Sequence, residues 1–341
     1  MPDPRKLSAQ QKAALLRRQR RQAQELIASY RQVWQTLKSD LDRLGVQIKE
    51  AKAAGEAVNR GWLVKQHRLE GLLGQVEGEM YLTTSFLERE ITTAQADAVL
   101  AGRINAEQLI AASLPPGLDW RPAFPTGAFR KLVGYAQDGQ PLGDLLAELG
   151  PLAAQDVKRA LVTGIALGKN PRVIARGARD ALGGNMARAL TIARTEVLRS
   201  YRESTRETYH ANKDVVEGWQ WSAALDNRTC SVCWGMHGEH FDTDEMMDTH
   251  PNCRCALVPT SKPWADLGFP DVAETRVELE PGADVFARQS ESVQRQVLGP
   301  GKYEAYRTGK IQLSDLVQET SSRRWGAGRR EASLKTALAN R

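Results

Sequence analysis

The sequence predicts an α+β protein that is mainly helical: a long N-terminal helical hairpin, then a mixed module with a small Cys/His β-region, then short C-terminal helices. Apolar residues recur at helical spacing over two long stretches before residue 81. A single clear alternation, Trp219-Gln220-Trp221-Ser222, is typical of a strand. All four cysteines then fall between Cys230 and Cys255. The 341 residues leave room for about two domains.

The predicted hairpin rests on two apolar stripes. Residues spaced by three and four run from Leu26 to Ile48 and again from Trp62 to Met80. This spacing places them on one face of each helix, and Gly55 and Gly61 mark the break between the helices. We therefore expect two antiparallel helices that cover each other.

Flanking apolar residues of the hairpin predict a docking surface. We expect them to lie beside the shared seam, where an exposed apolar patch marks an interaction site. The alternative is that the hairpin packs onto the chain after residue 142. The flanking residues are Trp34, Leu63 and Leu72.

Proline, glycine and changes of periodicity divide the chain into four ranges. They are the hairpin with its basic arm (1–112), a loop-rich linker (113–141), a Cys/His module (142–260) and a C-terminal extension (261–341). Within the last two we expect a helix break at Gly183-Gly184-Asn185, a weak strand at 272–279, and helices at about 285–298, 302–308 and 314–320. The tail is expected to end in a basic, helix-forming stretch.

Composition is that of an ordinary globular protein, with 41% apolar and 26% charged residues. No apolar run approaches the ~18 residues of a membrane span, and the N-terminus lacks a signal-peptide core. We expect a cytoplasmic origin and no membrane partner. The net charge is +6, and basic residues crowd the N-terminal arm. A solvated helix end is the favoured explanation for them, and non-specific DNA contact is the weaker one: Arg17, Arg18, Arg20 and Arg21.

The cysteine segment predicts a structural zinc site. Cys230-x-x-Cys233 is the spacing of a zinc knuckle, and His250, Cys253 and Cys255 follow about twenty positions later. Four of these five ligands would close a tetrahedral site, and the spacing leaves open which four. Free thiols are one alternative. Disulfides are another, which a reducing compartment disfavours.

Catalytic alternatives are less well supported by the pattern. A redox Cys-x-x-Cys pair needs a helix in a βαβ setting, whereas here a Trp-rich strand precedes it. A zinc-containing HNH-like nuclease would need His237 or His240 with Asp242 or Asp244 to activate water and hold a second ion. Glu239-His240 is the only adjacent acid–histidine pair and lies in a polar segment. We predict that the protein is not an enzyme.

Several motifs, in order, resemble one family over about residues 145–316. They are Ile192-Ala193-Arg194-Thr195-Glu196, Asp226-x-Arg228-Thr229-Cys230-x-x-Cys233, Gly235-Met236-His237-Gly238 and His250-Pro251-Asn252-Cys253-Arg254-Cys255. Together they are similar to the phage Mu F-like head-morphogenesis (minor capsid) proteins of tailed bacteriophages.

This resemblance implies a structural head protein of few copies. Its expected place is the virion, at the portal vertex inside the capsid, after assembly in the host cytoplasm. Its expected partners are the portal protein, other head proteins and DNA without sequence preference. A suggested kinship to the ADP-ribosyltransferase fold draws attention to Arg194 and Glu196. Because they lie two positions apart on one predicted helix, we interpret them as ion-pairing residues.

Overall fold

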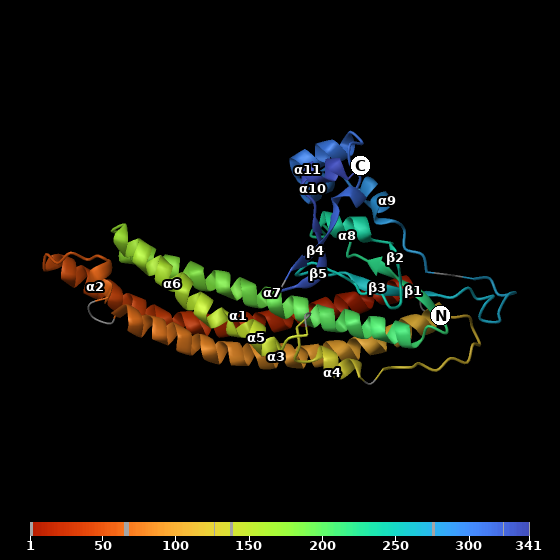
Figure 1. Cartoon of the computed structure of the whole chain (residues 1–341), viewed down its shortest axis with the longest axis horizontal. Coiled ribbons are helices and arrows are strands. Elements are labelled where there is room, and N and C mark those ends of the chain that lie inside the picture. Colours follow the sequence, from red (N-terminus) through yellow and green to blue (C-terminus); the bar gives the residue numbers. More distant parts are fainter. Residues whose placement is uncertain are drawn as a thin grey trace. The chain divides into compact units, whose positions relative to one another are not determined.

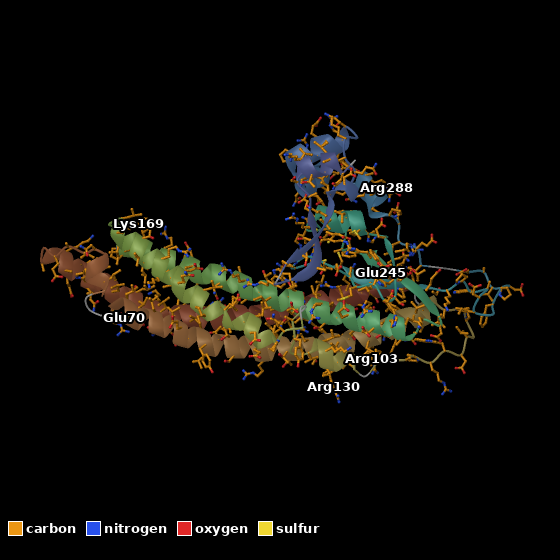
Figure 2. The ribbon with its side chains drawn as sticks, viewed as in Figure 1. Glu70, Arg103, Arg130, Lys169, Glu245 and Arg288 are labelled. Carbon is orange, nitrogen blue, oxygen red and sulfur yellow. The ribbon has the colours of Figure 1, made fainter. Side chains whose placement is uncertain are left out.

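A computed structural model describes residues 3–64, 68–125, 127–136, 139–274, 277–322 and 324–340. Long helices dominate, and the strands form two small antiparallel sheets (Figure 1). The predicted α+β, mainly helical class is confirmed. Charged side chains such as Arg130, Glu245 and Arg288 project from the surface (Figure 2). None of the helices in the described ranges is long and apolar enough to cross a membrane.

Two very long helices form the N-terminal hairpin. Helix α1 is Pro4–Ala53, and α3 is Arg68–Ser113. They run antiparallel: the Gln11 side chain reaches the carbonyl of Asn105, and the Gln22 side chain reaches the carbonyl of Glu90. Both helices extend well past the apolar stripes that predicted them. The remaining helices before the first strand are α2 (Arg60–Val64), α4 (Ala128–Leu132), α5 (Leu142–Ala147), α6 (Leu149–Ala166) and α7 (Pro171–Ala211).

Contacts divide the chain into two compact units, each assembled from separate segments. We call residues 18–93 and 140–194 the helical unit. Residues 1–17, 94–139 and 195–341 form the cysteine unit. Helices α1, α3 and α7 contribute residues to both. The sequence predicted four consecutive ranges, whereas these two units each combine segments that lie apart in the chain. The division into four ranges therefore stays a prediction.

The helical unit is held by burial of the two stripes against α6 and α7. Leu26, Leu87 and Ile91 are almost fully buried. A polar link joins three helices: Asn185 accepts a hydrogen bond from the Tyr30 hydroxyl at 2.6 Å and donates to the carbonyl of Leu149 at 2.8 Å. A buried amide needs such partners to offset its desolvation.

The helical unit differs from expectation in the continuity of α7 and in the burial of Leu63 and Leu72. Gly183-Gly184-Asn185 does not break the helix, because it lies inside α7, where packing and the Asn185 bonds outweigh the low helix propensity of glycine. Leu63 and Leu72 are buried, and Trp34 is half-buried. The later helices cover much of the surface expected to dock a partner, because Tyr30 of α1 bonds to α7 and Met80 of α3 lies against Gly150 of α6.

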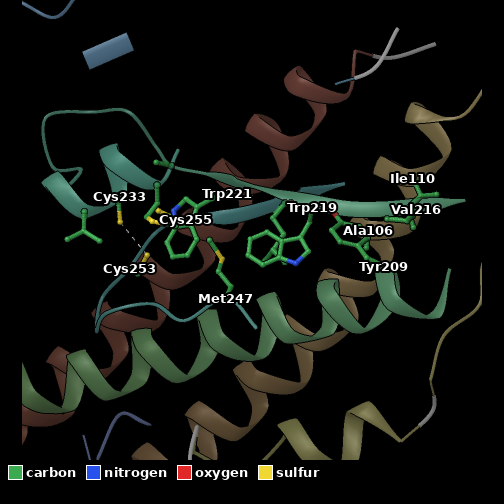
Figure 3. Packing of buried hydrophobic residues seen from close by; sticks show 14 of the residues in the cluster. Ala106, Ile110, Tyr209, Val216, Trp219, Trp221, Cys233, Met247, Cys253 and Cys255 are labelled. Carbon is green, nitrogen blue, oxygen red and sulfur yellow. Dashed lines mark hydrogen bonds between the residues drawn. The ribbon is translucent and has the colours of Figure 1, made fainter. Parts of the chain in front are cut away.

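A three-stranded antiparallel sheet lies in the cysteine unit, in the order β2-β1-β3. Strand β1 is Val216–Ser222, β2 is His240–Asp242 and β3 is Ala256–Ser261. The strand predicted from the Trp alternation is therefore confirmed. Trp219 and Trp221 are fully buried, and the Trp219 ring stacks on Phe241 with centroids 4.4 Å apart. Figure 3 shows both tryptophans in one cluster with Cys233, Cys253 and Cys255.

The C-terminal part differs from expectation in three places. A helix was expected over 314–320, but a 3-10 turn (η1, Ser314–Leu316) leads instead into β4, Val317–Ser322. Strand β4 pairs with β5, Gly326–Glu331, a partner that no local pattern reveals. Residues 272–274 and 277–279 form no strand, and positions 275–276 lie outside the described residues. The basic tail contains β5 before it reaches α11.

The other C-terminal helices are close to prediction. Helix α9 is Gly282–Ala287, α10 is Glu291–Arg307 and α11 is Leu334–Ala339. Helix α10 is kinked at Gly299, whose φ of 69° suits glycine, just before Pro300. The helices expected at about 285–298 and 302–308 lie on either side of this kink, whereas the break between α9 and α10 at residues 288–290 was not predicted.

Candidate metal centre

The first ligand-bearing segment is a tight turn followed by a short helix. After β1 the Asp226 carboxylate accepts hydrogen bonds from the Arg228 backbone and the Thr229 hydroxyl. Cys230 is then the N-cap of α8, Ser231–Met236, and its sulfur accepts from the Cys233 backbone at 3.5 Å. Capping favours Cys230 in an extended conformation at the helix start. Both cysteine side chains therefore face the same side of the turn.

The second segment is the turn His250–Cys255, which leads into β3. Asn252 has a positive φ of 63°, a conformation that asparagine tolerates better than most residues. Its backbone N–H donates to the Thr195 hydroxyl of α7 at 3.1 Å. The Cys253 N–H donates to the His250 carbonyl at 3.2 Å, closing the turn. The reversal brings His250 and Cys253 to face α8.

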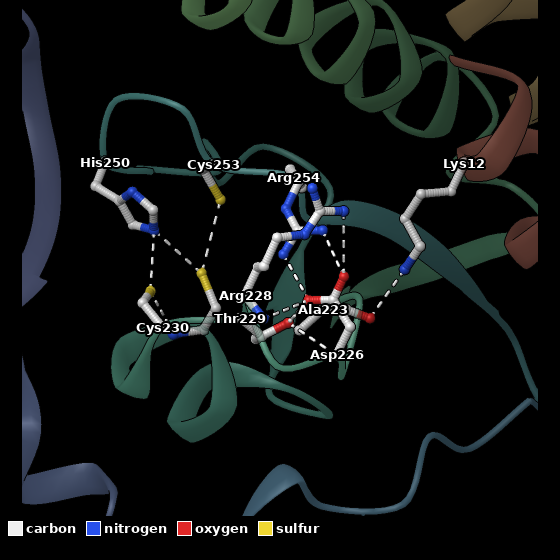
Figure 4. A network of polar contacts seen from close by, with 10 residues as sticks. Lys12, Ala223, Asp226, Arg228, Thr229, Cys230, His250, Cys253 and Arg254 are labelled. Atoms are coloured by element: carbon white, nitrogen blue, oxygen red, sulfur yellow. Dashed lines mark hydrogen bonds and ion pairs between the residues drawn. The ribbon is translucent and has the colours of Figure 1, made fainter. Parts of the chain in front are cut away.

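A bidentate ion pair joins the two segments (Figure 4). Arg254, between Cys253 and Cys255, donates to both carboxylate oxygens of Asp226, each at 2.6 Å. This hydrogen bonding, which is stronger than the opposing effect of burial, holds the pKa of Asp226 well below its usual range. The same pair raises the pKa of Arg254. This ion pair, which we call the clamp, therefore ties the turn before α8 to the turn before β3.

Buried Arg202 anchors the second segment to helix α7. Its guanidinium donates to the carbonyl of Cys253 at 3.3 Å and to the Thr249 hydroxyl at 3.1 Å. Only 3% of Arg202 is exposed. Helix α7 thus holds the His250–Cys255 turn in place through these hydrogen bonds.

The five candidate ligands converge at the centre of this arrangement. The Nε2 atom of His250 lies 3.2 Å from the sulfur of Cys230 and 3.2 Å from that of Cys233. The Cys233 sulfur lies 3.7 Å from that of Cys253. Ligand atoms of Cys233, Cys253 and Cys255 also lie within 4.8 Å of one another. All four cysteines are free thiols, and no disulfide joins them.

The orientation of His250 suits a metal ligand. Its Nδ1 lies 2.8 Å from the carbonyl of Pro251. An Nδ1–H donated to this carbonyl leaves the lone pair of Nε2 directed at the sulfurs, the tautomer that a zinc-binding imidazole requires. Burial alone lowers the pKa of His250, but the facing thiols of Cys230 and Cys253 raise it to about 11.

The thiols differ in their tendency to ionise. Hydrogen bonding from Cys233 lowers the pKa of Cys230 to about 5, and hydrogen bonding from Cys233 and Cys255 lowers that of Cys253. The pKa of Cys233 is raised by the adjacent sulfurs of Cys230 and Cys253, and that of Cys255 chiefly by burial. A closely packed group of buried thiols can ionise together only when a cation offsets their charge.

These donors fit a zinc ion. Tetrahedral zinc with Zn–S near ~2.3 Å and Zn–N near ~2.0 Å separates its ligand atoms by roughly 3.5–3.8 Å. The observed separations of 3.2 and 3.7 Å are close to this range. Thiolates and imidazole are also the ligand types that zinc prefers.

Two titratable groups lie near the centre: Lys12, which the sequence did not indicate, and His237, which was considered only for catalysis. Lys12 of α1 donates to the Ala223 carbonyl at 2.9 Å and the Ser222 hydroxyl at 3.2 Å, and burial lowers its pKa. His237 accepts a hydrogen bond from the Ala223 N–H at 3.0 Å, and burial lowers its pKa to about 4. Lys12 lies 210 positions from Ser222, so no local pattern could pair them. The Asp226–Arg254 clamp, by contrast, falls within the two recognised motifs.

The residues considered for catalysis do not form one site. His237 is buried and hydrogen-bonded to the backbone, whereas His240 and Asp242 lie on the exposed strand β2. They line an open hollow with acidic neighbours such as Glu245. Glu196 is fully buried and forms an ion pair with Arg199 at 2.9 Å. The interpretation of Glu196 as an ion-pairing residue agrees with this geometry.

The four arginines of the N-terminal arm that were considered for DNA contact are all exposed on α1.

The fold and site define a mainly helical protein that carries a small module in which cysteines and a histidine gather as they could around a metal ion. Residues 155–258 match the model of the family described as Phage Mu protein F like protein. The matched range begins in α6, includes all of α7 and ends in β3, so it contains all five candidate ligands. This segment is therefore phage Mu F-like, which confirms the resemblance seen in the motifs. No curated protein and no solved structure matches the chain.

Proposed function

We propose that the protein is a structural component of a tailed-phage head, acting in head morphogenesis at the portal vertex. The observation that carries this proposal is the phage Mu F-like match over residues 155–258, which ends in the Cys/His module. Long helices and a small rigid module suit a protein that docks other proteins. The proposed partners are the portal protein and other head proteins, and the exposed arginines of α1 are available to contact packaged DNA.

We propose further that Cys230, Cys233, His250 and Cys253 hold one structural zinc ion. Five of the six pairs within this set face each other: Cys230–Cys233, Cys230–His250, Cys233–His250, Cys233–Cys253 and Cys253–His250. Cys255 faces Cys233, Cys253 and Trp221 instead of the imidazole. We therefore propose that Cys255 packs against the ligands and does not bind the ion itself.

Zinc in this position would serve folding and not catalysis. Three thiolates and an imidazole complete the tetrahedron, so no position remains for a reactive water. The ion would join the α8 turn to the turn before β3, which Arg254 already clamps on the other side. The burial of His237 and Glu196 supports the proposal that the protein has no nuclease or transferase activity.

Metal analysis tests the zinc proposal. Inductively coupled plasma mass spectrometry on protein purified without added metal should give close to one zinc per chain. Cys230→Ser and Cys253→Ser should lose the ion, whereas Cys255→Ser should keep most of it. Equal loss in all three variants would refute the assignment of Cys255, and well-folded metal-free protein would refute the site itself.

A particle inventory tests the proposed role in the head. Mass spectrometry of purified phage particles and of portal-containing assembly intermediates should detect the protein in both. Detection only in the soluble lysate would contradict the role. Incubation with plasmid and Mg²⁺ or Mn²⁺ should leave the plasmid supercoiled, and cleavage abolished by His240→Ala would support the nuclease alternative.

A further inference from the structure

An open groove of about 450 Å³ lies between α1 and α7 inside the helical unit. Its floor is apolar and includes half-buried Trp34 and buried Leu41. Val46, 53% exposed, lies on the α1 side. Gly45 has no side chain, and a Cβ there would lie 3.4 Å from Pro171, so the start of α7 closely approaches α1. The groove is therefore an open channel between two helices, with apolar side chains along its floor and charged side chains on its rims.

One rim of the groove is strongly basic. Arg172, Arg176 and Arg179 of α7 line it, at the i, i+4 and i+7 spacing that places side chains on one helix face. All three are exposed, and the ion pair of Arg179 is a long 3.4 Å contact with the exposed Asp180. These arginines span about 10 Å at ~1.5 Å per residue. Among the residues that the structure describes, no buried acidic side chain forms an ion pair with these arginines.

The opposite rim, on α1, carries both signs of charge. Lys49 and Asp42 line it, seven positions apart, and Asp42 already bonds to Lys38 at 2.7 Å. The two rims thus differ in charge. A helix bound in the groove would have one edge beside the arginines of α7 and the other beside the mixed charges of α1. From Trp34 to Lys49 the α1 wall extends about 22 Å, the length of a helix of ~15 residues.

We propose that this groove binds an amphipathic helix of a partner protein whose apolar face covers Trp34 and Val46 and whose acidic edge lies along Arg172, Arg176 and Arg179. Apolar anchors in a helical groove supply affinity, and flanking ion pairs select the partner and its orientation. Nucleic acid fits less well, because a phosphate backbone gains nothing from the apolar floor and would meet the Asp42 carboxylate. The proposal does not depend on the zinc site or on a role in the phage head.

Fluorescence anisotropy with defined probes tests the proposal on the full-length protein as purified. The main probe is a labelled 21-residue helical peptide with Leu at heptad positions a and d and Glu at e and g, where Glu–Glu repulsion keeps it monomeric. The comparison probes are the same peptide with Lys at e and g, and a labelled 20-base-pair DNA duplex. The acidic peptide should bind at least tenfold more tightly than either.

Charge reversal on the rim supplies the matched variants. Arg172→Glu with Arg176→Glu should weaken binding of the acidic peptide at least tenfold. Lys158→Glu with Arg159→Glu, the same charge change at exposed positions of α6 outside the groove, should change it less than twofold. Trp34→Ala should weaken binding without altering the preference for Glu over Lys. Circular dichroism should show equal helicity in all variants.

Three outcomes would overturn the proposal. The first is no binding of the acidic peptide, or equal binding of the Lys peptide. The second is an equal loss of affinity in the α6 control, which would indicate only a net-charge effect. The third is tighter binding of duplex DNA that the Arg172 and Arg176 changes abolish, which would assign the groove to nucleic acid.

Discussion

The helical unit and the cysteine unit are stabilised in different ways. In the helical unit, apolar side chains such as Leu87 and Ile91 repeat along long helices, so each contributes a small part of a distributed core. In the cysteine unit, short strands and turns depend on a few polar links: the Asp226–Arg254 clamp, buried Arg202 and the proposed zinc site. A distributed core loses stability in small steps, whereas a site with a single centre fails as a whole.

Of the changes considered, removal of the proposed zinc ion should lower stability most. It should disrupt the cysteine unit and leave the helical unit folded. Structural zinc in small sites contributes roughly 10 kcal/mol of binding free energy, which is lost on chelation. A strong chelator should abolish the near-ultraviolet circular dichroism of the buried Trp219 and Trp221, while far-ultraviolet helicity stays nearly unchanged. Simultaneous loss of both signals would show that the two units unfold together.

A core truncation probes the helical unit in the same way. Leu87 is fully buried in α3, and Leu87→Ala should lower the free energy of unfolding by about 3 kcal/mol through lost burial and a residual cavity. Urea denaturation followed by far-ultraviolet circular dichroism measures the change. The zinc content should stay at one per chain. Loss of zinc in this variant would contradict the independence of the two regions.

Acidification should destabilise the cysteine unit through His237. Burial lowers the pKa of His237 to about 4 from an unfolded value near ~6.5, so between these pH values the unfolded state binds the extra proton. The stabilisation from the neutral imidazole is therefore fully present above about pH 6.5, and the free energy of unfolding falls by about 3 kcal/mol as the pH drops to 4. His237→Asn keeps an acceptor for the Ala223 N–H and removes the titration. Its melting temperature should vary less with pH over this window, and an unchanged slope would exclude His237 as the cause.

Loss of the Asp226–Arg254 clamp should give the smallest of these effects. The Asp226 side chain is 37% exposed, so solvent screening limits the contribution of the pair to about 1 kcal/mol. Its folded pKa is depressed, so this stabilisation is present above about pH 4 and is lost as the pH falls below it. Thermal melts of Asp226→Asn at pH 7 should show a drop of a few degrees. Zinc should remain bound, but its loss to a competing chelator should be faster than in Asn227→Ala, a change at the adjacent turn residue outside the clamp.

Local patterns in the sequence were sufficient for much of this protein. The stripes from Leu26 to Ile48 and from Trp62 to Met80 predicted the hairpin, because helical periodicity is a property of neighbouring residues. The Trp219–Trp221 alternation predicted β1 for the same reason. Cysteine spacing also singled out five candidate ligands whose side chains the fold brings together, since structural zinc sites commonly take pairs of ligands from short turns.

Tertiary structure decided what depends on residues far apart in the chain. The bonds of Asn185 to Tyr30 and Leu149 keep α7 continuous through two glycines, and pairing with β5 makes β4 a strand. Burial of Leu63 and Leu72 and the asymmetric groove beside Trp34 likewise arise only when separate helices pack together. The proposed choice among the five candidate ligands likewise rests on the tertiary structure, because the chain spacing of Cys253 and Cys255 does not reveal which of these two faces His250. Local propensity is a weak force that packing over long sequence separations readily overrides.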